Sequence, residues 1–262
     1  MYLKSIKPIT PSQRQLKLLD KSTLSKKIKP LKSLTSGLSL SGGRNNLGRI
    51  TNYRIGGGHK RLYRKINFYR KEKESIVLSI EYDPNRTANI ASIYDTINRS
   101  PSYILAPQGL KKGDLVCSWH TAQIKIGHTL SLEKVPVGTF IHNVSVSPKK
   151  KGQIARAAGN YIQLLGKQQG LCRLKFPSGK QKVVLEACRA SIGTLSNENK
   201  NLINLGKAGR STWLNKRPSV RGVAMNPHDH PHGGGEGKTS GGRPSVTPWG
   251  KPARGQKTAK FR

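Results

Sequence analysis

The chain has 262 residues, which is enough for one large domain or two small ones. It carries 48 Lys and Arg against 12 Asp and Glu, a formal net charge of +36, and only 34% of its residues are hydrophobic. A charge excess of this size predicts a polyanionic partner, and the short apolar runs exclude a bilayer-spanning segment. The basic segments lack a helical apolar stripe, so we expect no membrane partner.

The positive charge is concentrated toward both ends of the chain. Residues 1–71 contain 18 Lys or Arg and a single acid, Asp20, and residues 199–262 contain 13 against two acids. Residues 72–198 are more balanced, with 17 basic residues and nine acids. This distribution predicts a folded middle section with a basic arm at each end.

The first 48 residues predict an extended basic arm. Lys and Ser dominate this segment, and Pro8, Pro11 and Pro30 interrupt it. It contains too little apolar surface to offset the entropy of ordering the chain, so we expect it to fold on a partner.

Short strands separated by Gly or Pro turns begin at about residue 49. We expect strands at Ser75–Tyr82, Ala88–Tyr94, Ser102–Leu105 and Asp114–Ser118, with a turn at residues 83–85. Strands this short favour a small barrel over a parallel sheet. The section at 49–120 is therefore predicted as a first barrel.

A second set of strands predicts a second small barrel over residues 121–199. The expected strands are Thr139–Val146, Tyr161–Leu165, Leu171–Phe176, Val183–Ala187 and Ala190–Leu195. We expect one short helical turn at Ile154–Ala158. Regular patterning fades after about residue 200, so residues 200–262 are predicted as a second extended, basic segment rich in Gly and Pro.

The segment HDHPHGGGEGKTSGG, residues 228–242, resembles a nucleotide-binding loop only superficially. A P-loop requires Gly five positions before the Gly that precedes Lys-Thr, and His232 occupies that position. The loop would also have to open a helix, which Pro244 prevents. We therefore expect no nucleoside triphosphate site here.

The same segment leaves metal binding and catalysis open as alternatives. In an extended chain the alternating His228, His230 and His232 would point to one side and could hold zinc, but Pro and Gly leave little rigid scaffold. The side chains of adjacent Asp229 and His230 diverge, which disfavours a catalytic pair. A metal-dependent RNA-processing enzyme and a free RNA chaperone or DNA-compacting protein remain the alternatives, and we predict no metal ligand and no cofactor.

Gly, basic and aromatic residues are interleaved both in residues 41–70 and in residues 228–254. Glycine lets backbone N–H groups approach phosphate oxygens closely, and His or Trp rings can stack on unpaired bases. Lys and Arg supply the counter-charge. This combination suits irregularly folded RNA better than a smooth duplex.

A series of motifs resembles the large ribosomal subunit protein 2 family over residues 36–255. They include SGGRNNLGRIT, GGGHKRLYR, EYDPNRTANIA, VPVGTFIHNV, GQIARAAGNY and RPSVRGVAMNPHDHPHGGGEGKTSGGRPSVTPWG, in this order along the chain. The resemblance implies a mainly β fold with an OB-like barrel followed by an SH3-like barrel. It also implies a non-enzymatic structural protein that binds and organises rRNA near the peptidyl transferase centre and supports subunit association.

The partners that the resemblance implies are large-subunit rRNA, other ribosomal proteins and the small subunit, with rRNA-bound magnesium nearby. His230 matches a family histidine once considered catalytic, and we expect it to contact rRNA. The complete predicted rRNA-binding set is Arg44, Arg49, Arg54, His59, Lys60, Arg61, Arg64, Lys65, Arg70, Arg86, Lys149, Lys150, Lys151, Arg156, Lys207, Arg210, Trp213, Arg217, Arg221, His228, His230, His232, Lys238, Arg243, Trp249, Lys251 and Arg254.

The form of the C-terminal segment bears on location. GKTSGGRPSVTPWGKP is similar to mitochondrially encoded family members, and the richness in Ile, Asn and Lys suits an A+T-rich organellar genome. We therefore expect a mitochondrial ribosome, with a plastid or the bacterial cytoplasm as the alternative.

Overall fold

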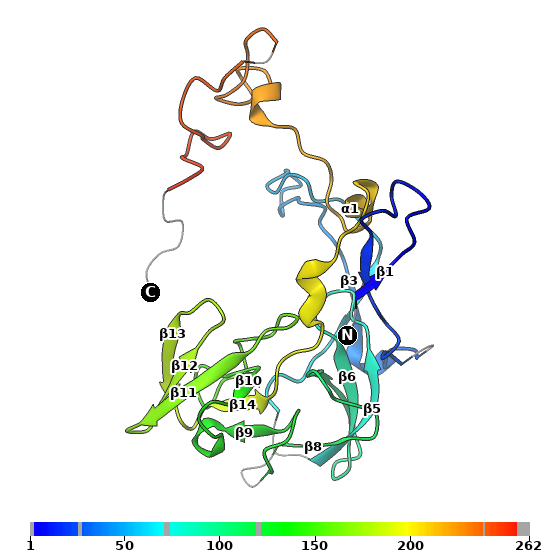
Figure 1. The fold of residues 1–262 in the computed structure, drawn as a ribbon, viewed down its shortest axis with the longest axis vertical. Helices are drawn as coiled ribbons and strands as arrows, with labels where there is room; N and C mark the ends of the chain where they lie inside the picture. Colours follow the sequence, from blue (N-terminus) through cyan, green and yellow to red (C-terminus); the bar gives the residue numbers. More distant parts are fainter. Residues whose placement is uncertain (1–2, 26–27, 71–73, 119–121, 238, 256–262) are drawn as a thin grey trace. The chain divides into compact units, whose positions relative to one another are not determined.

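The computed structural model describes residues 3–25, 28–70, 74–118, 122–237 and 239–255 (Figure 1). The chain forms two compact units. Unit 1 comprises residues 1–40 and 59–210, and unit 2 comprises residues 41–58 and 211–262. The prediction of a mainly β fold is confirmed, since the described part of the chain contains small antiparallel sheets and one five-residue α-helix, α1 (Gly209–Trp213).

Unit 1 contains a four-stranded antiparallel sheet. Its order is β7 (Pro101–Leu105), β6 (Ile90–Asp95), β5 (Glu74–Glu81) and β8 (Leu115–Cys117). Apolar side chains on one face form a small core of Val77, Ala91, Ile93, Ile104, Ala106, Leu110 and Val116. Cross-strand pairing places Ser79, Ser92 and Tyr103 on the opposite face of this sheet.

Polar side chains are buried beside this core and satisfy one another. The Ser79 hydroxyl donates to a Glu81 carboxylate oxygen (2.8 Å), and the hydroxyl of the fully buried Tyr103 donates to the other oxygen (3.1 Å). The Leu31 N–H in turn donates to the Tyr103 hydroxyl (2.9 Å). Buried polar groups are tolerated when they are paired in this way, and the network fixes residues near 31 to the sheet.

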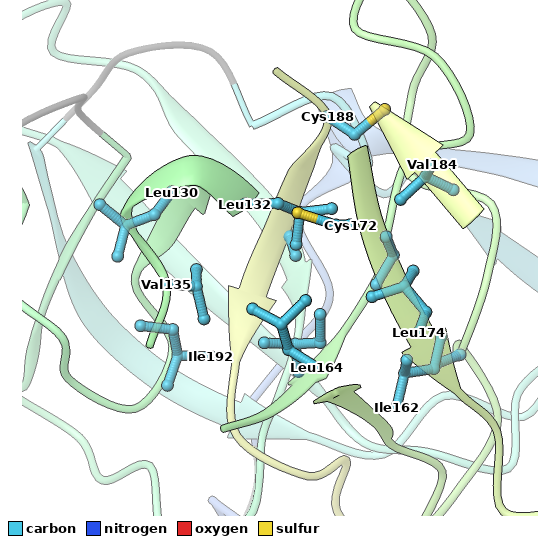
Figure 2. Packing of buried hydrophobic residues seen from close by; sticks show 14 residues of the cluster. Leu130, Leu132, Val135, Ile162, Leu164, Cys172, Leu174, Val184, Cys188 and Ile192 are labelled. Atoms are coloured by element: carbon cyan, nitrogen blue, oxygen red, sulfur yellow. The ribbon is translucent and has the colours of Figure 1, made fainter. Parts of the chain in front are cut away.

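A second sheet of six antiparallel strands forms the larger core of unit 1. Its order is β13 (Gln181–Leu185), β12 (Leu171–Lys175), β11 (Ile162–Gln168), β10 (Phe140–His142), β14 (Arg189–Ile192) and β9 (Thr129–Ser131). Figure 2 shows side chains from these strands, such as Leu164, Cys172 and Leu174, packed against one another. Leu132, Leu164 and Cys172 are completely buried, so this sheet has a dry core.

The remaining elements are short. Strands β1 (Leu3–Ser5) and β2 (Lys17–Leu19) pair with each other, as do β3 (Thr35–Leu38) and β4 (Arg61–Arg64). Single 3₁₀ turns are η1 (Lys32–Leu34), η2 (Leu132–Lys134), η3 (Glu198–Leu202) and η4 (Gly222–Ala224). Three of these strands lie in the segment for which the sequence predicted an extended arm. No helix in the described residues is long and apolar enough to cross a membrane.

The expected helical turn at Ile154–Ala158 is wrong. Ile154 forms an antiparallel bridge with Val144, and the Val144 carbonyl accepts the Ile154 N–H at 3.0 Å. Ala155 has a φ of +54°, in the left-handed region, which is incompatible with a right-handed helix. Residues 154–158 therefore follow an extended and bent path and form no helical turn.

Candidate nucleic-acid interface

Unit 2 is the most one-sidedly charged part of the chain. Residues 41–58 contain three Arg and no acid, and residues 211–262 contain ten Lys or Arg against Asp229 and Glu236. Among its described residues only Gly42, Gly43 and His230 are buried. The described side chains of unit 2 therefore lie mostly exposed on loops. Because these loops have no apolar core, other interactions must hold their conformation.

The loop at residues 42–52 is ordered by backbone geometry and one asparagine. The Asn45 side chain accepts N–H bonds from Leu47 and Arg49, both at 3.0 Å. Gly43 has a φ of +82°, and a Cβ atom on it would lie 2.2 Å from the Asn52 carbonyl oxygen. Only glycine fits there, and the resulting tight loop leaves Arg44 and Arg49 exposed.

The two chain segments of unit 2 are joined through their backbones. The Gly56 N–H donates to the Asn215 carbonyl and the Arg217 N–H donates to the Arg54 carbonyl, both at 3.0 Å. A Cβ atom on Gly58, whose φ is +60°, would lie 1.6 Å from the Asn215 side-chain oxygen. Segments more than 150 residues apart are thus held in register, and they bring Arg54 and Arg217 to the same part of the unit.

The histidine segment is compact, not extended. Residues 227–229 and 231–232 form turns, so the expectation that three alternating histidines point to one side is wrong. The His228 side chain is 75% exposed, with Nε2 3.2 Å from the Asp229 carboxylate, whereas His230 is 7% exposed and stacks on the His232 ring at a centroid distance of 5.1 Å. The described residues contain no group of three His, Cys, Asp or Glu placed to hold a metal ion.

His230 and His232 hold this segment together through defined ring nitrogens. The His232 N–H donates to His230 Nδ1, and the Val246 N–H donates to His232 Nε2, both at 3.0 Å. Since His232 Nε2 accepts, its Nδ1 carries the hydrogen that is donated to the Gly241 carbonyl (3.1 Å). The His232 ring therefore links backbone groups 9 and 14 residues away, whereas the His230 ring is bonded to the N–H of a residue two positions on.

Glycines allow the chain to pack directly against these rings. A Cβ atom on Gly222 would lie 2.4 Å from the His230 ring, and one on Gly241 would lie 2.7 Å from His232 Nδ1. Such distances are far below normal contact, so a side chain at either position would displace a ring. The Gly-rich composition of this segment therefore has a packing reason.

Trp249 is presented on a tight turn. The Gly250 N–H donates to the Thr247 carbonyl (2.9 Å), the Thr247 N–H donates to the Lys251 carbonyl (2.8 Å), and Gly250 adopts a φ of +76°. The indole is 69% exposed, with its ring centroid 6.4 Å from that of Tyr53. A large aromatic side chain is thereby held at the surface among basic residues.

Comparison with known proteins gives two family matches. Residues 31–118 match the family described as Ribosomal Proteins L2, RNA binding N-terminal domain, and residues 125–250 match Ribosomal Proteins L2, C-terminal domain. The chain is 57% identical to the large ribosomal subunit protein uL2 of Rhodospirillum centenum over 261 residues, which cover 98% of this chain and 94% of the relative. It is also 57% identical to uL2 of Brucella abortus and of Brucella suis, covering 93% of each.

The chain belongs to the ribosomal protein L2 family. The family boundary between residues 118 and 125 separates the four-stranded sheet from the six-stranded sheet. The L2 matches also include most of unit 2, so the histidine segment and the Trp249 turn are within the family's C-terminal domain.

The structure places most of the predicted rRNA-binding side chains of this L2 protein at the surface. The exposed ones are Arg44, Arg49, Arg54, His59, Lys60, Lys65, Lys149, Lys150, Lys151, Lys207, Trp213, Arg217, Arg221, His228, Arg243, Trp249, Lys251 and Arg254. Half-buried are Arg61, Arg64, Arg86, Arg156, Arg210 and His232, and Arg70 and His230 are buried. Lys238 lies outside the described residues.

Arg70 is used inside unit 1. Its side chain is 5% exposed, its Nε donates to the Ser118 hydroxyl (3.2 Å), and a terminal nitrogen donates to the Gly127 carbonyl (3.1 Å). Burial lowers the pKa of its guanidinium to about 10. The group therefore stabilises the junction between β8 and the segment before β9, away from the surface that RNA can reach in the free protein.

Arg86 and Arg156 also have intramolecular partners. Arg86 forms an ion pair with the buried Asp83 (3.0 Å), and its guanidinium lies 5.4 Å from the ring centroids of Tyr63 and Phe68. Arg156 covers the Phe68 ring at 3.9 Å, and burial followed by the charge of Arg86 lowers its pKa. This cluster is half-buried and positively charged, so it can present charge to a polyanion only at its rim.

Tyr53 and Asn45 were missed by the sequence analysis. Tyr53 has the aromatic character that singled out Trp249, and its position in a Gly- and Arg-rich segment was the available signal. Asn45 acts only through its hydrogen bonds to the following loop, which no motif indicates.

Proposed function

We propose that this chain is a non-enzymatic structural constituent of the large ribosomal subunit that binds and organises rRNA. The observation that carries the proposal is unit 2, in which an excess of basic residues is displayed on loops ordered by glycines, Asn45 and two histidines. Ordered loops place cations at fixed positions, which suits a folded polyanion of defined shape. Family membership supports the same assignment.

The position of the protein within the ribosome is a further part of the proposal. We propose that the C-terminal segment reaches rRNA near the peptidyl transferase centre and that the protein supports association with the small subunit, as the family resemblance implies. The exposed basic side chains of the predicted rRNA-binding set bind phosphates, and other ribosomal proteins pack nearby. His230 is assigned a structural role beside the rRNA, because its side chain is 7% exposed and its Nδ1 accepts the His232 N–H.

Co-sedimentation tests this function directly. Large subunits from the source organism, washed in high salt, are expected to contain the chain at one copy per particle. Its absence from washed subunits, with recovery in free RNA–protein or nucleoid fractions, would support the alternative of a free RNA chaperone or DNA-compacting protein.

A His230→Ala variant tests the structural role of this histidine. The variant is expected to assemble less efficiently while β5–β14 remain folded. Normal assembly with loss of peptide-bond formation alone would contradict the structural role.

We also propose a mitochondrial ribosome as the location. The similarity of the C-terminal segment to mitochondrially encoded members and the richness in Ile, Asn and Lys support this, although the relatives compared above are bacterial. Fractionation of the source organism distinguishes a mitochondrial from a bacterial cytoplasmic ribosome. Ribosomes purified from mitochondria contain the chain if the proposal holds, and no such ribosomes contain it if the bacterial cytoplasm is the location.

A further inference from the structure

Unit 2 contains a cleft of about 810 Å³ between its two chain segments. Residues from 42–55 and from 217–249 line it, and they include the two aromatic side chains Tyr53 and Trp249. The volume falls within the roughly 300–1,000 Å³ that is typical of ligand sites. The apolar side chains of this cleft do not belong to an apolar core, since the described residues of unit 2 include no buried apolar side chain.

The cleft is lined by flat and aliphatic side chains that remain open to solvent. Tyr53 is 60% exposed and Trp249 is 69% exposed, with an angle of 41° between their rings. Ile50, Ile55 and Val220 add aliphatic surface, and all three are also exposed. Such a concentration of exposed apolar groups in a highly charged protein marks a binding site.

Cationic groups surround these apolar side chains. Arg44, Arg54 and Arg217 all line the cleft and are exposed. The backbone bond between Arg217 and Arg54 and the tight loop at Gly43 fix where these three side chains originate. An occupant must therefore combine a flat apolar body with negative charge beside it.

One carboxylate also lines the cleft. Asp229 contributes a carboxylate, one oxygen of which lies 3.2 Å from His228 Nε2. A carboxylate accepts hydrogen bonds from amino groups on base edges. It disfavours a bare anion as the occupant, because like charges repel.

We propose that this cleft binds one unpaired nucleobase of RNA, stacked on the Trp249 ring beside Tyr53, while Arg44, Arg54 and Arg217 neutralise the flanking phosphates. Each nucleotide brings a π face and a phosphate together, which matches the lining. An apolar peptide side chain would fill the cleft but leave three guanidinium groups without counter-charge. The inference rests on the proposed function in rRNA binding. It adds that one base of that RNA is unstacked from its neighbours and inserted into this cleft.

Three substitutions of Trp249 test the stacking in the full-length chain. The probe is a transcript of the large-subunit rRNA of the source organism, and the readouts are the dissociation constant and the chemical reactivity of unpaired bases. Trp249→Ala is expected to weaken binding roughly 5- to 100-fold, which corresponds to the loss of one base–aromatic stack. Trp249→Phe retains a ring and stays close to wild type, whereas Trp249→Leu retains only apolar bulk and weakens binding almost as much as Ala.

The base itself should be visible in the reactivity pattern. One unpaired base is expected to be protected by the wild type and by the Phe variant, and to become reactive with the Leu and Ala variants. If the Leu variant binds as tightly as wild type, an apolar side chain of a protein or no base occupies the cleft, and the inference is wrong.

The salt dependence separates this inference from the proposed function. None of the three variants removes a charge, so the slope of log affinity against log salt should remain that of the wild type. A steep slope with unchanged affinity for Trp249→Ala overturns the nucleobase cleft alone. A wild type that binds rRNA no better than an unrelated RNA, with a flat slope, overturns the proposed function.

Discussion

Unit 1 buries aliphatic side chains from six strands in one core, whereas the described residues of unit 2 bury one histidine and no apolar side chain. The same chain thus uses the hydrophobic effect in one region and hydrogen bonds with glycine contacts in the other. The difference teaches that a low hydrophobic content need not mean disorder in a basic segment.

The largest effect is expected from truncating the core of unit 1. Leu164 is completely buried between β-strands, so Leu164→Ala should lower the free energy of unfolding by about 2–5 kcal/mol through lost transfer energy and a cavity. Urea denaturation followed by circular dichroism measures this. Leu185→Ala, at a half-exposed leucine of β13, is the matched control and should cost below about 1 kcal/mol. Equal losses would show that the sheet has no dry core.

A pH-dependent stability is the second expectation for unit 1. His142 is 1% exposed and donates from Nδ1 to the Gly193 carbonyl, and burial lowers its pKa from 6.5 to about 4. The unfolded chain takes up this proton below pH 6.5 but the folded chain does not until about pH 4. Stability is therefore complete above pH 6.5 and falls by up to about 3 kcal/mol toward pH 4. His142→Gln should remove this part of the pH dependence in urea titrations, and an unchanged profile would contradict the assignment.

Unit 2 should be destabilised by substitutions that add side-chain atoms at its glycines, whereas unit 1 is destabilised by substitutions that remove them from its core. Gly222→Ala forces a methyl group against the His230 ring and is expected to destabilise the histidine segment by about 1–3 kcal/mol. Gly57→Ala is the matched control, because no atom lies within 4 Å of its added Cβ. Amide hydrogen exchange at His232 reports the difference. Equal exchange in both variants would mean that the histidine packing does not order unit 2.

The smallest effect concerns one histidine hydrogen bond. His232→Ala removes the bond to the Gly241 carbonyl, the stack on His230 and the acceptor of the Val246 N–H, and the last of these should cost about 1 kcal/mol, which raises exchange of the Val246 amide about fivefold. His228→Ala alters a side chain that is 75% exposed and should leave the Val246 amide unchanged. The comparison fails if both substitutions accelerate exchange alike.

The sequence predicted the β fold better than the detailed contacts. The expected strand Ser75–Tyr82 differs from β5 by one residue at each end, and Leu171–Phe176 differs from β12 by one residue at its C-terminal end, because turn residues bound them. Strands β4 and β9 were not predicted, since a run of three or four residues shows no periodicity and gains its pairing from distant partners. Thr139–Val146 was too long a prediction for β10, because a positive φ at Asn143 ends the strand.

Among the predicted site residues, composition could not separate structural arginines from exposed ones. Arg49 and Arg70 both lie in the same basic, aromatic segment, but one is exposed and the other is held by Ser118 and Gly127 far along the chain. Likewise, the alternation of His228 and His230 suggested equivalent positions, and turns at Pro227 and Pro231 place them in different environments. Long-range partners decide such roles, and a local pattern does not contain them.

The most direct measurement of the role of unit 2 is the salt dependence of rRNA affinity for two triple variants. Arg44, Arg54 and Arg217 changed to Gln should reduce the log–log slope by about two to three units, since each phosphate contact contributes about 0.7–0.9. Lys111, Lys112 and Lys134 changed to Gln remove the same charge from exposed positions of unit 1 and should leave the slope nearly unchanged. Equal reductions in both variants would contradict the assignment of rRNA binding to ordered positions in unit 2, because net charge alone would then explain the affinity.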